Sequence, residues 1–197
     1  IAYRSYKNFA ITLIEILCIP SLSKQEMISL VKLSDGSVEL IKNLANQNKG
    51  LLICTAHFSN WEFAAISTSL QVNEPFYVIA KSQRNDLVDK WMNNAREKWL
   101  NKVVQLGISI RNVYAELKKG HMIGIVCDQR GPADGIRVNF FNRATSLFSG
   151  AGVLHSKLNS PLVIGIPVRQ KDFTYSLEVI EIKTENTSQV FIDFFRL

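Results

Sequence analysis

The sequence predicts an α/β fold: a layered, mostly parallel central sheet flanked by helices, with a helical segment at the amino-terminal end. Short apolar runs rich in β-branched residues, such as 51–55 and 162–168, have the length and composition of buried strands. Segments with helical periodicity separate these runs along most of the chain. Strands that alternate with helices in this way form parallel, layered sheets.

The amino-terminal part is predicted to be helical. Residues 3–19 form an apolar helix that Pro20 ends, because proline cannot continue a helix. Ser23 begins a second helix, with Glu26 three positions later as its capping-box partner. Further helices are expected at 37–47 after an interruption at Gly36, from Ser59 or Asn60 onward, at 85–99, at 112–119 and at 150–157.

The predicted strands are mainly continuous apolar runs, which suit strands buried on both faces. They lie at 51–55, 76–80, 103–106, 122–127, 162–168 and 175–182. The last of them alternates apolar and polar residues, which suits the edge of a sheet. Residues 136–141 also alternate.

Size and composition fit one folded domain. The 197 residues are 47% hydrophobic, enough for a sizeable core, and 20% charged, which argues against disorder. The chain starts at Ile1 instead of methionine and ends within an amphipathic-looking run, 190–197. We therefore expect residues 1–197 to be a single domain of a longer protein, truncated at both ends.

Positive charge is concentrated in the middle of the chain. Nine bases and four acids lie between Lys81 and Lys119, a net of +5 out of +6 for the whole chain. Such a segment suits an anionic membrane, a phosphorylated substrate, an acidic carrier protein or nucleic acid, although it could also be a solvated face. Its aromatic residues Trp91, Trp99 and Tyr114 fit a core or interface stripe, so we expect no nucleic-acid partner.

Nothing in the sequence indicates a metal or another cofactor. Cys18, Cys54 and Cys127 fit no metal-ligand spacing, and the last two lie in apolar runs as small buried hydrophobic residues of a reducing compartment. His121 and His155 show no ligand pattern with the third histidine, and no glycine-rich phosphate loop is present.

The most apolar segment, residues 9–20, is shorter than the roughly 20 residues needed to span a bilayer and contains Glu15. It could lie in a membrane interface or cap the core.

The strongest chemical signal is His57, which follows the first buried strand, with Glu62 five positions later. The carboxyl ends of strands in open α/β sheets are where ligands bind. The two side chains can meet if His57 precedes the helix and Glu62 lies in its first turn. A neutral imidazole accepts a proton at pH 7, and a carboxylate on its other nitrogen would stabilise the imidazolium. Alternatively, Glu62 only caps the helix in a box with Ser59, and His57 is an ordinary loop residue.

A histidine base of this kind needs a nucleophile to deprotonate. No serine has the glycine-flanked setting of a nucleophile elbow. A hydroxyl of the substrate, attacking an acyl group, is therefore the natural candidate. Asp128 and Gln129 end another strand and could share the mouth of the same crevice, and Arg96 could bind phosphate. Each of these three is a weak signal by itself.

Together these residues resemble the late acyltransferases of bacterial lipid A biosynthesis, within the glycerophospholipid acyltransferases. The segment 57–62, His-Phe-Ser-Asn-Trp-Glu, resembles the family's His-x-x-Asn-Trp-Glu block. Further similar blocks follow in the family's order: the helix carrying Arg96, Leu-Lys-Lys-Gly at 117–120, Asp-Gln at 128–129, Val-Asn-Phe-Phe-Asn-Arg at 138–143, and the strand from Pro161 to Arg169. The departures are Asn139 for proline, Asn142 for glycine, and the loss of a second proline after Arg143.

The resemblance implies a lauroyl- or myristoyl-transferase-like O-acyltransferase. It would move a fatty acyl chain from an acyl carrier protein or CoA thioester to a hydroxyl of a phosphorylated lipid A precursor. His57 would be the general base, supported by Glu62. Asp128 would shape the site and not act as a second base. The substrate-binding residues implied are Asn60, Arg96, Asp128, Gln129, Arg143 and Arg169.

The implied location is the cytoplasmic face of the bacterial inner membrane, as a peripheral protein or one anchored by a segment missing here. Its anionic surface would be a partner of the basic segment. Acylation of another glycolipid, an aminolipid or a lysophospholipid is the alternative within the class. Outside it, one alternative is a non-catalytic module that binds anionic membrane or nucleic acid. Another is a serine-type hydrolase that uses His57, which the lack of an elbow serine disfavours.

Overall fold

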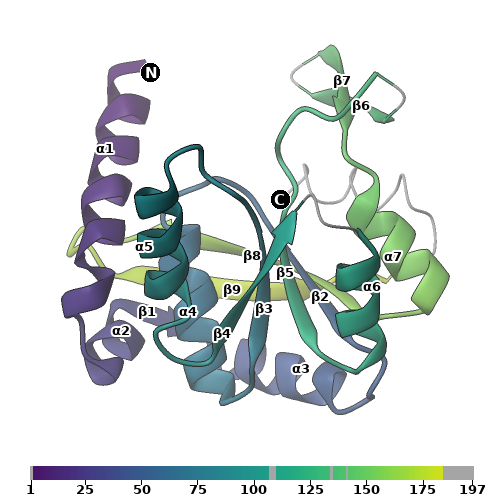
Figure 1. Cartoon of the computed structure of the whole chain (residues 1–197), viewed down its shortest axis with the longest axis horizontal. Helices are drawn as coiled ribbons and strands as arrows, with labels where there is room; N and C mark the ends of the chain where they lie inside the picture. Colours follow the sequence, from purple (N-terminus) through teal and green to yellow (C-terminus); the bar gives the residue numbers. More distant parts are fainter. Residues whose placement is uncertain (1, 107–109, 134, 141, 184–197) are drawn as a thin grey trace.

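A seven-stranded sheet forms the middle layer of the protein, with helices on both of its faces (Figure 1). The computed structural model describes residues 2–106, 110–133, 135–140 and 142–183, so the run at 190–197 lies outside the described residues. The strand order is β1-β9-β8-β2-β5-β3-β4, and all neighbours are parallel except β8 and β9. The predicted α/β fold with a mostly parallel sheet is therefore confirmed.

The strands of this sheet follow the apolar runs closely. Their bounds are β1 Val31–Leu33, β2 Leu51–Thr55, β3 Phe76–Lys81, β4 Asn101–Leu106, β5 Met122–Val126, β8 Leu162–Arg169 and β9 Tyr175–Glu181. The short strand β1 is not predicted, and it pairs with the first three residues of β9. The prediction that the last strand lies at the sheet edge is therefore wrong. It alternates because one of its faces is exposed to solvent.

The helices also agree in position with their sequence signals. Their bounds are α1 Ala2–Cys18, α2 Lys24–Leu30, α3 Asp35–Ala45, α4 Trp61–Val72, α5 Asp86–Arg96, α6 Ile110–Lys118 and α7 Gly150–Leu158, with a short 3₁₀ turn at Ile19–Ser21. Ser23 and Glu26 form both hydrogen bonds of the predicted capping box, at 3.2 and 2.8 Å. Gly36 lies within the first turn of α3, capped by Ser34, and does not interrupt that helix.

Two hydrophobic clusters fill the space between sheet and helices. One lies between the sheet and α1 to α5, with Phe63, Ile66 and Tyr175 among its members. The other lies between the opposite face and α6 and α7, around Leu117 and Leu162. The sheet is thus covered on both faces, which explains the continuous apolar runs of its central strands.

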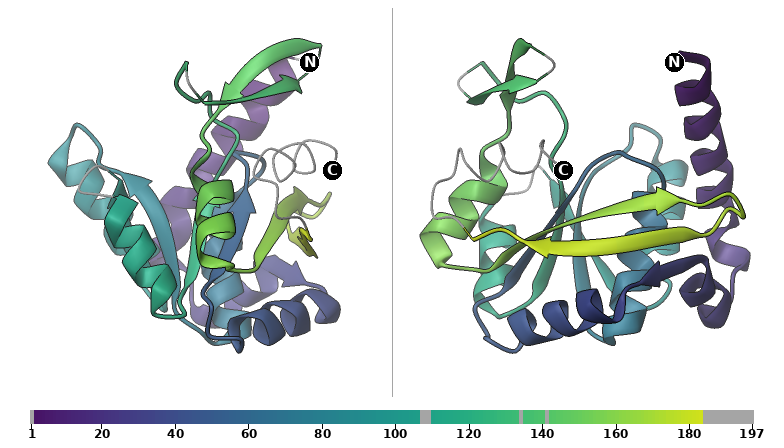
Figure 2. Two further views of the ribbon diagram at one scale, coloured as in Figure 1. Left: turned by 90° about the vertical axis from the view of Figure 1, so that its right-hand side faces the viewer. Right: turned by 180° about the vertical axis from the view of Figure 1, so that it is seen from behind.

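Two segments extend beyond these layers at the carboxyl end of the parallel strands (Figure 2). One is the amino-terminal half of α1. The other is an antiparallel hairpin of β6 Ile136–Phe140 and β7 Arg143–Leu147, which contains most of the predicted alternating segment. Asn142 in its turn has φ +58°, a left-handed conformation that asparagine tolerates better than most residues.

Candidate active site

Three adjacent strands bring predicted site residues together at the end of the sheet that is formed by the carboxyl ends of its parallel strands. The strands β8, β2 and β5 are parallel neighbours, so their carboxyl ends lie side by side. Arg169 is the last residue of β8, His57 follows β2, and Asp128 follows β5. Ligands of open α/β sheets bind at this edge.

Asp128 is the carboxylate that holds the His57 ring. Nδ1 of His57 lies 2.7 Å from Oδ1 of Asp128, and the backbone N–H of His57 donates to Oδ2 at 2.9 Å. Burial alone would raise the pKa of the Asp128 carboxyl, but its interactions with His57 together hold that pKa below its ordinary value. The ionised carboxylate can only accept, so it favours the tautomer in which Nδ1–H donates a hydrogen bond to it, and this leaves Nε2 as the basic nitrogen of the ring. The His57 side chain is 35% exposed, so the ring is accessible from outside.

The loop between β2 and α4 sets the direction of this ring. Ser59 has φ +57°, a left-handed conformation, and the next residue, Asn60, is the N-cap of α4. Oδ1 of Asn60 accepts from the backbone N–H of Phe63 at 2.9 Å. The ring of Trp61 meets that of His57 edge-on, with centroids 4.8 Å apart. The predicted capping box of Ser59 and Glu62 is therefore wrong, because the cap is one residue later.

Glu62 pairs with Arg96, the last residue of α5. Nε of Arg96 donates to both carboxylate oxygens at 3.0 and 3.1 Å, and Nη2 donates to Oε1 at 2.6 Å. Burial alone would lower the pKa of Arg96, but its bonds to Glu62 raise it, so the guanidinium stays charged. The prediction that Glu62 contacts His57 is wrong. Glu62 is buried, and a buried carboxylate is stable only beside an opposite charge, which the fork-shaped guanidinium supplies.

A groove beside His57 offers space for a substrate. Its volume is about 610 Å³, and α1, the β2–α4 loop and the carboxyl end of β8 line it. Its apolar lining includes Tyr6, Phe9, Phe58 and Trp61, and its polar lining residues are Ser5, Asn8, Thr12, His57, Ser59, Arg169, Gln170 and Lys171. A smaller hollow of about 350 Å³ lies near Lys49 and Ser160 and contains none of the predicted site residues.

Arg169 borders this groove, but its donors are already used within the protein. Nε donates to the Tyr175 hydroxyl at 2.8 Å, and Nη2 donates to Glu15 at 2.9 Å and to Thr12 at 3.0 Å. Nη1 lies 3.4 Å from the side-chain oxygen of Asn8. The guanidinium thus connects β8 to α1 in the structure described.

The other predicted binding residues have different settings. Asn60 is fully buried, and its Oδ1 caps α4. Gln129 and Arg143 are exposed, the first directly after Asp128 and the second in the β6–β7 hairpin. In the described part of the chain neither side chain hydrogen-bonds to His57 or Glu62. Thr12 and Tyr175 have no signal of a site in the sequence, and the only signal at Glu15 is an acid within an apolar helix.

Two cysteines lie in or directly after the strands that lead to this site. Cys54 and Cys127 are free thiols and buried, as predicted. A hydrogen bond between the thiols of Cys127 and Cys54, together with burial, raises the pKa of Cys127 well above its ordinary value. A thiol that stays protonated is a poor nucleophile. Across the described residues, no group of three or more histidine, cysteine or acidic side chains could hold a metal ion.

The fold and the site define an α/β protein in which a histidine, oriented by a carboxylate, lines a groove at the carboxyl end of a mostly parallel sheet. The sequence model of the bacterial lipid A biosynthesis acyltransferase family matches residues 1–193, so the chain belongs to that family and is an acyltransferase. This confirms the resemblance seen in the sequence. A search of curated proteins found no match. Among the described helices, none is both long and apolar enough to cross a membrane.

Proposed function

We propose that this acyltransferase moves a fatty acyl chain from an acyl carrier protein or CoA thioester to a hydroxyl of a phosphorylated lipid A precursor. His57 is the general base, and Asp128 takes the supporting role first assigned to Glu62. The observation that carries the proposal is the 2.7 Å contact between Nδ1 of His57 and Asp128, beside a groove of about 610 Å³.

The chemistry begins when Nε2 of His57 accepts the proton of the acceptor hydroxyl. The hydroxyl oxygen then attacks the thioester carbonyl and forms the new carbon–oxygen bond. When the carbon–sulfur bond breaks, the thiolate leaves and takes the proton from the imidazolium. Asp128 stabilises the imidazolium between these steps. Backbone N–H groups near the start of α4 supply positive electrostatic potential for the oxyanion.

The lining of the groove suits an amphipathic substrate. The aromatic side chains on α1 and the β2–α4 loop suit an acyl chain. Lys171, also in the lining, supplies positive charge for phosphate, and Arg130 and Arg143 lie exposed on the segments after β5. An acceptor lipid without phosphate, such as an aminolipid, would use the same chemistry with less need for these cations.

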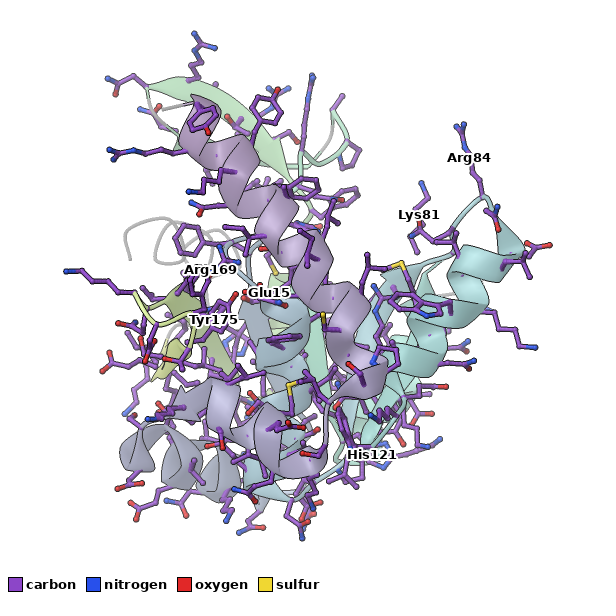
Figure 3. All side chains as sticks on the ribbon, turned by 90° about the vertical axis from the view of Figure 1, so that its left-hand side faces the viewer. Glu15, Lys81, Arg84, His121, Arg169 and Tyr175 are labelled. Carbon is purple, nitrogen blue, oxygen red and sulfur yellow. The ribbon has the colours of Figure 1, made fainter. Side chains whose placement is uncertain are left out.

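The surface near the groove also favours an anionic membrane as a partner, at the cytoplasmic face of the inner membrane. Large apolar side chains of α1 are exposed: Tyr3, Tyr6, Phe9, Leu13, Ile14 and Leu17. Lys81 and Arg84 project near the start of α5, whereas His121 lies at the opposite end of the molecule (Figure 3). Exposed apolar and basic side chains together are typical of proteins that bind anionic lipid surfaces.

The test is acyl transfer by the full-length protein in membranes, with an acyl carrier thioester and candidate acceptor lipids, read by mass spectrometry. His57→Gln should lower the transfer rate by about 100-fold or more. His121→Gln is the matched control and should leave the rate unchanged, because that ring stacks on Tyr77 far from the groove. Retained transfer by His57→Gln would refute the mechanism. If the protein acylates other lipids but no lipid A precursor, the proposed substrate is refuted.

A further inference from the structure

A largely buried polar cluster joins α1 to the end of the sheet that carries His57. We call it the Glu15 cluster; it consists of Thr12, Glu15, Asn60, Arg169 and Tyr175. Figure 3 shows Glu15, Arg169 and Tyr175 together where α1 passes the ends of β8 and β9. The side chains of Glu15 and Arg169 are only 16% and 13% exposed.

One oxygen of Glu15 is the centre of the cluster. Oε2 accepts from Nη2 of Arg169 at 2.9 Å and from Nδ2 of Asn60 at 3.0 Å, and it also accepts from the Tyr175 hydroxyl. Burial raises the pKa of Tyr175, and its bond to Glu15 raises it further, so the phenol keeps the proton that it donates. Burial alone would lower the pKa of Arg169, but its bonds to Tyr175 and Glu15 raise it. The cluster is therefore a charged pair with its hydrogen-bonding capacity well used.

The cluster reaches the β2–α4 loop at two successive residues. Glu15 fixes Asn60 through Nδ2, while the other end of that amide, Oδ1, caps α4 through Phe63. The Thr12 hydroxyl lies within donating distance of the backbone carbonyl of Ser59, at 3.0 Å, and shares its proton with the carbonyl of Asn8 in its own helix, at 3.1 Å. Ser59 is the residue in the left-handed conformation, two positions after His57. Non-glycine residues keep such a conformation only when their surroundings hold it.

An anchor for α1 alone would not need these two contacts. Arg169, Tyr175 and Glu15 already join α1 to β8 and β9. The bonds to Ser59 and Asn60 add support to the loop on one side, while Asp128 holds the His57 ring on the other. The direction of Nε2 therefore depends on both supports.

We propose that Glu15 is a positioning residue for the acyl transfer. By orienting Asn60, it keeps the β2–α4 loop in the conformation that directs His57 toward the groove. This inference rests on the proposed function of His57. It assigns to α1 a part in the chemistry in addition to lining the groove.

Glu15→Ala in the full-length protein is the central test. It should lower kcat by about tenfold to hundredfold and change KM for donor and acceptor little, because misplacement of a catalytic group affects the chemical step most. Glu15→Gln keeps an acceptor for Asn60 but loses the charge beside Arg169. It should restore kcat to within about threefold of the unmodified protein while Tm stays lowered. A purely structural anchor would give no such recovery of kcat.

Glu26→Ala is the matched control, since it removes a helix-associated carboxylate and its bond to the Ser23 backbone without a bond to the loop. Hydrogen exchange, measured by mass spectrometry on the peptide spanning residues 57–64, should be faster in Glu15→Ala and unchanged in Glu26→Ala. Unchanged exchange in Glu15→Ala, or faster exchange with unchanged kcat, would overturn the positioning role. Absence of transfer by the unmodified protein would instead overturn the proposed function, and the exchange result would still decide whether Glu15 holds the loop.

Discussion

Two carboxylates near His57 have opposite settings, and the difference assigns their roles. Asp128 is half-buried and bonded to the imidazole of His57, which lines the groove. Glu62 is buried and bonded to Arg96 through both of its oxygens. The first can stabilise positive charge that develops on His57 during a reaction. The second neutralises a permanent charge and joins the start of α4 to the end of α5.

Asp128→Asn should therefore lower acyl transfer by about 100-fold or more, because an asparagine neither fixes the Nδ1 proton nor stabilises the imidazolium. The pKa of Asp128 is lowered in the folded state, so its ionisation stabilises the protein above the unfolded value of about 3.9. That stability is lost as pH falls through the lower folded pKa. Acid unfolding followed by circular dichroism should accordingly be less steep in the variant. Asp35→Asn, at the exposed start of α3, is the control.

Glu62→Gln distinguishes the observed pairing of Glu62 with Arg96 from the predicted pairing of Glu62 with His57. It leaves Arg96 buried without its counter-charge, so it should cost about 3 kcal/mol of stability. Asp128→Asn should change stability at neutral pH much less. If Asp128→Asn keeps full transfer activity, Asp128 is not the supporting carboxylate.

At the scale of the elements, local signals predicted most positions well. Proline, the capping box and apolar periodicity locate α1, α2 and the central strands, because each acts within a few residues. β1 has only three residues, too few for a pattern. The partner of His57 is 71 positions away, and sequence spacing offered Glu62 only because it is near in the chain.

Gly131 shows how the hairpin supports the site from a neighbouring element. Its N–H donates to the carbonyl of Ser146 at 2.7 Å, and a Cβ added to it would collide with the backbone of Leu147. Gly131→Ala should therefore displace the segment after β5, including Asp128, and lower transfer by about tenfold or more. Gly36→Ala is the matched control. No atom lies within 4 Å of its added Cβ, so it should raise stability, by up to about 1 kcal/mol, without changing activity.

At the scale of the whole molecule, the bases that are clustered in the sequence do not form a single basic surface in the structure. Of the nine bases between Lys81 and Lys119, several serve the fold. Arg96 pairs with Glu62, and Lys119 pairs with Glu116. Lys98 donates to three backbone carbonyls, two in the 3₁₀ turn at Ile19–Ser21 and one at Leu22. The basic segment is thus not one continuous docking face. The bases with the best position for an anionic surface include two outside it, Arg4 and Lys7, on the exposed part of α1.

The amino-terminal half of α1 extends beyond the layers of the fold (Figure 1) and carries both kinds of side chain that an anionic bilayer attracts, apolar and basic. The protein should therefore sediment with vesicles containing phosphatidylglycerol and much less with pure phosphatidylcholine vesicles. Each base near an anionic surface contributes about 1 kcal/mol, so replacing Arg4 and Lys7 together by serine should weaken binding by about thirtyfold. The same replacement at Lys42 and Lys49, which lie away from this end, is the matched control.

Raising the salt concentration should weaken binding without abolishing it, since the apolar contacts of Tyr3 and Tyr6 are not screened. Equal binding to both kinds of vesicle would refute the electrostatic part, and equal losses in the two double variants would exclude α1 as the contact.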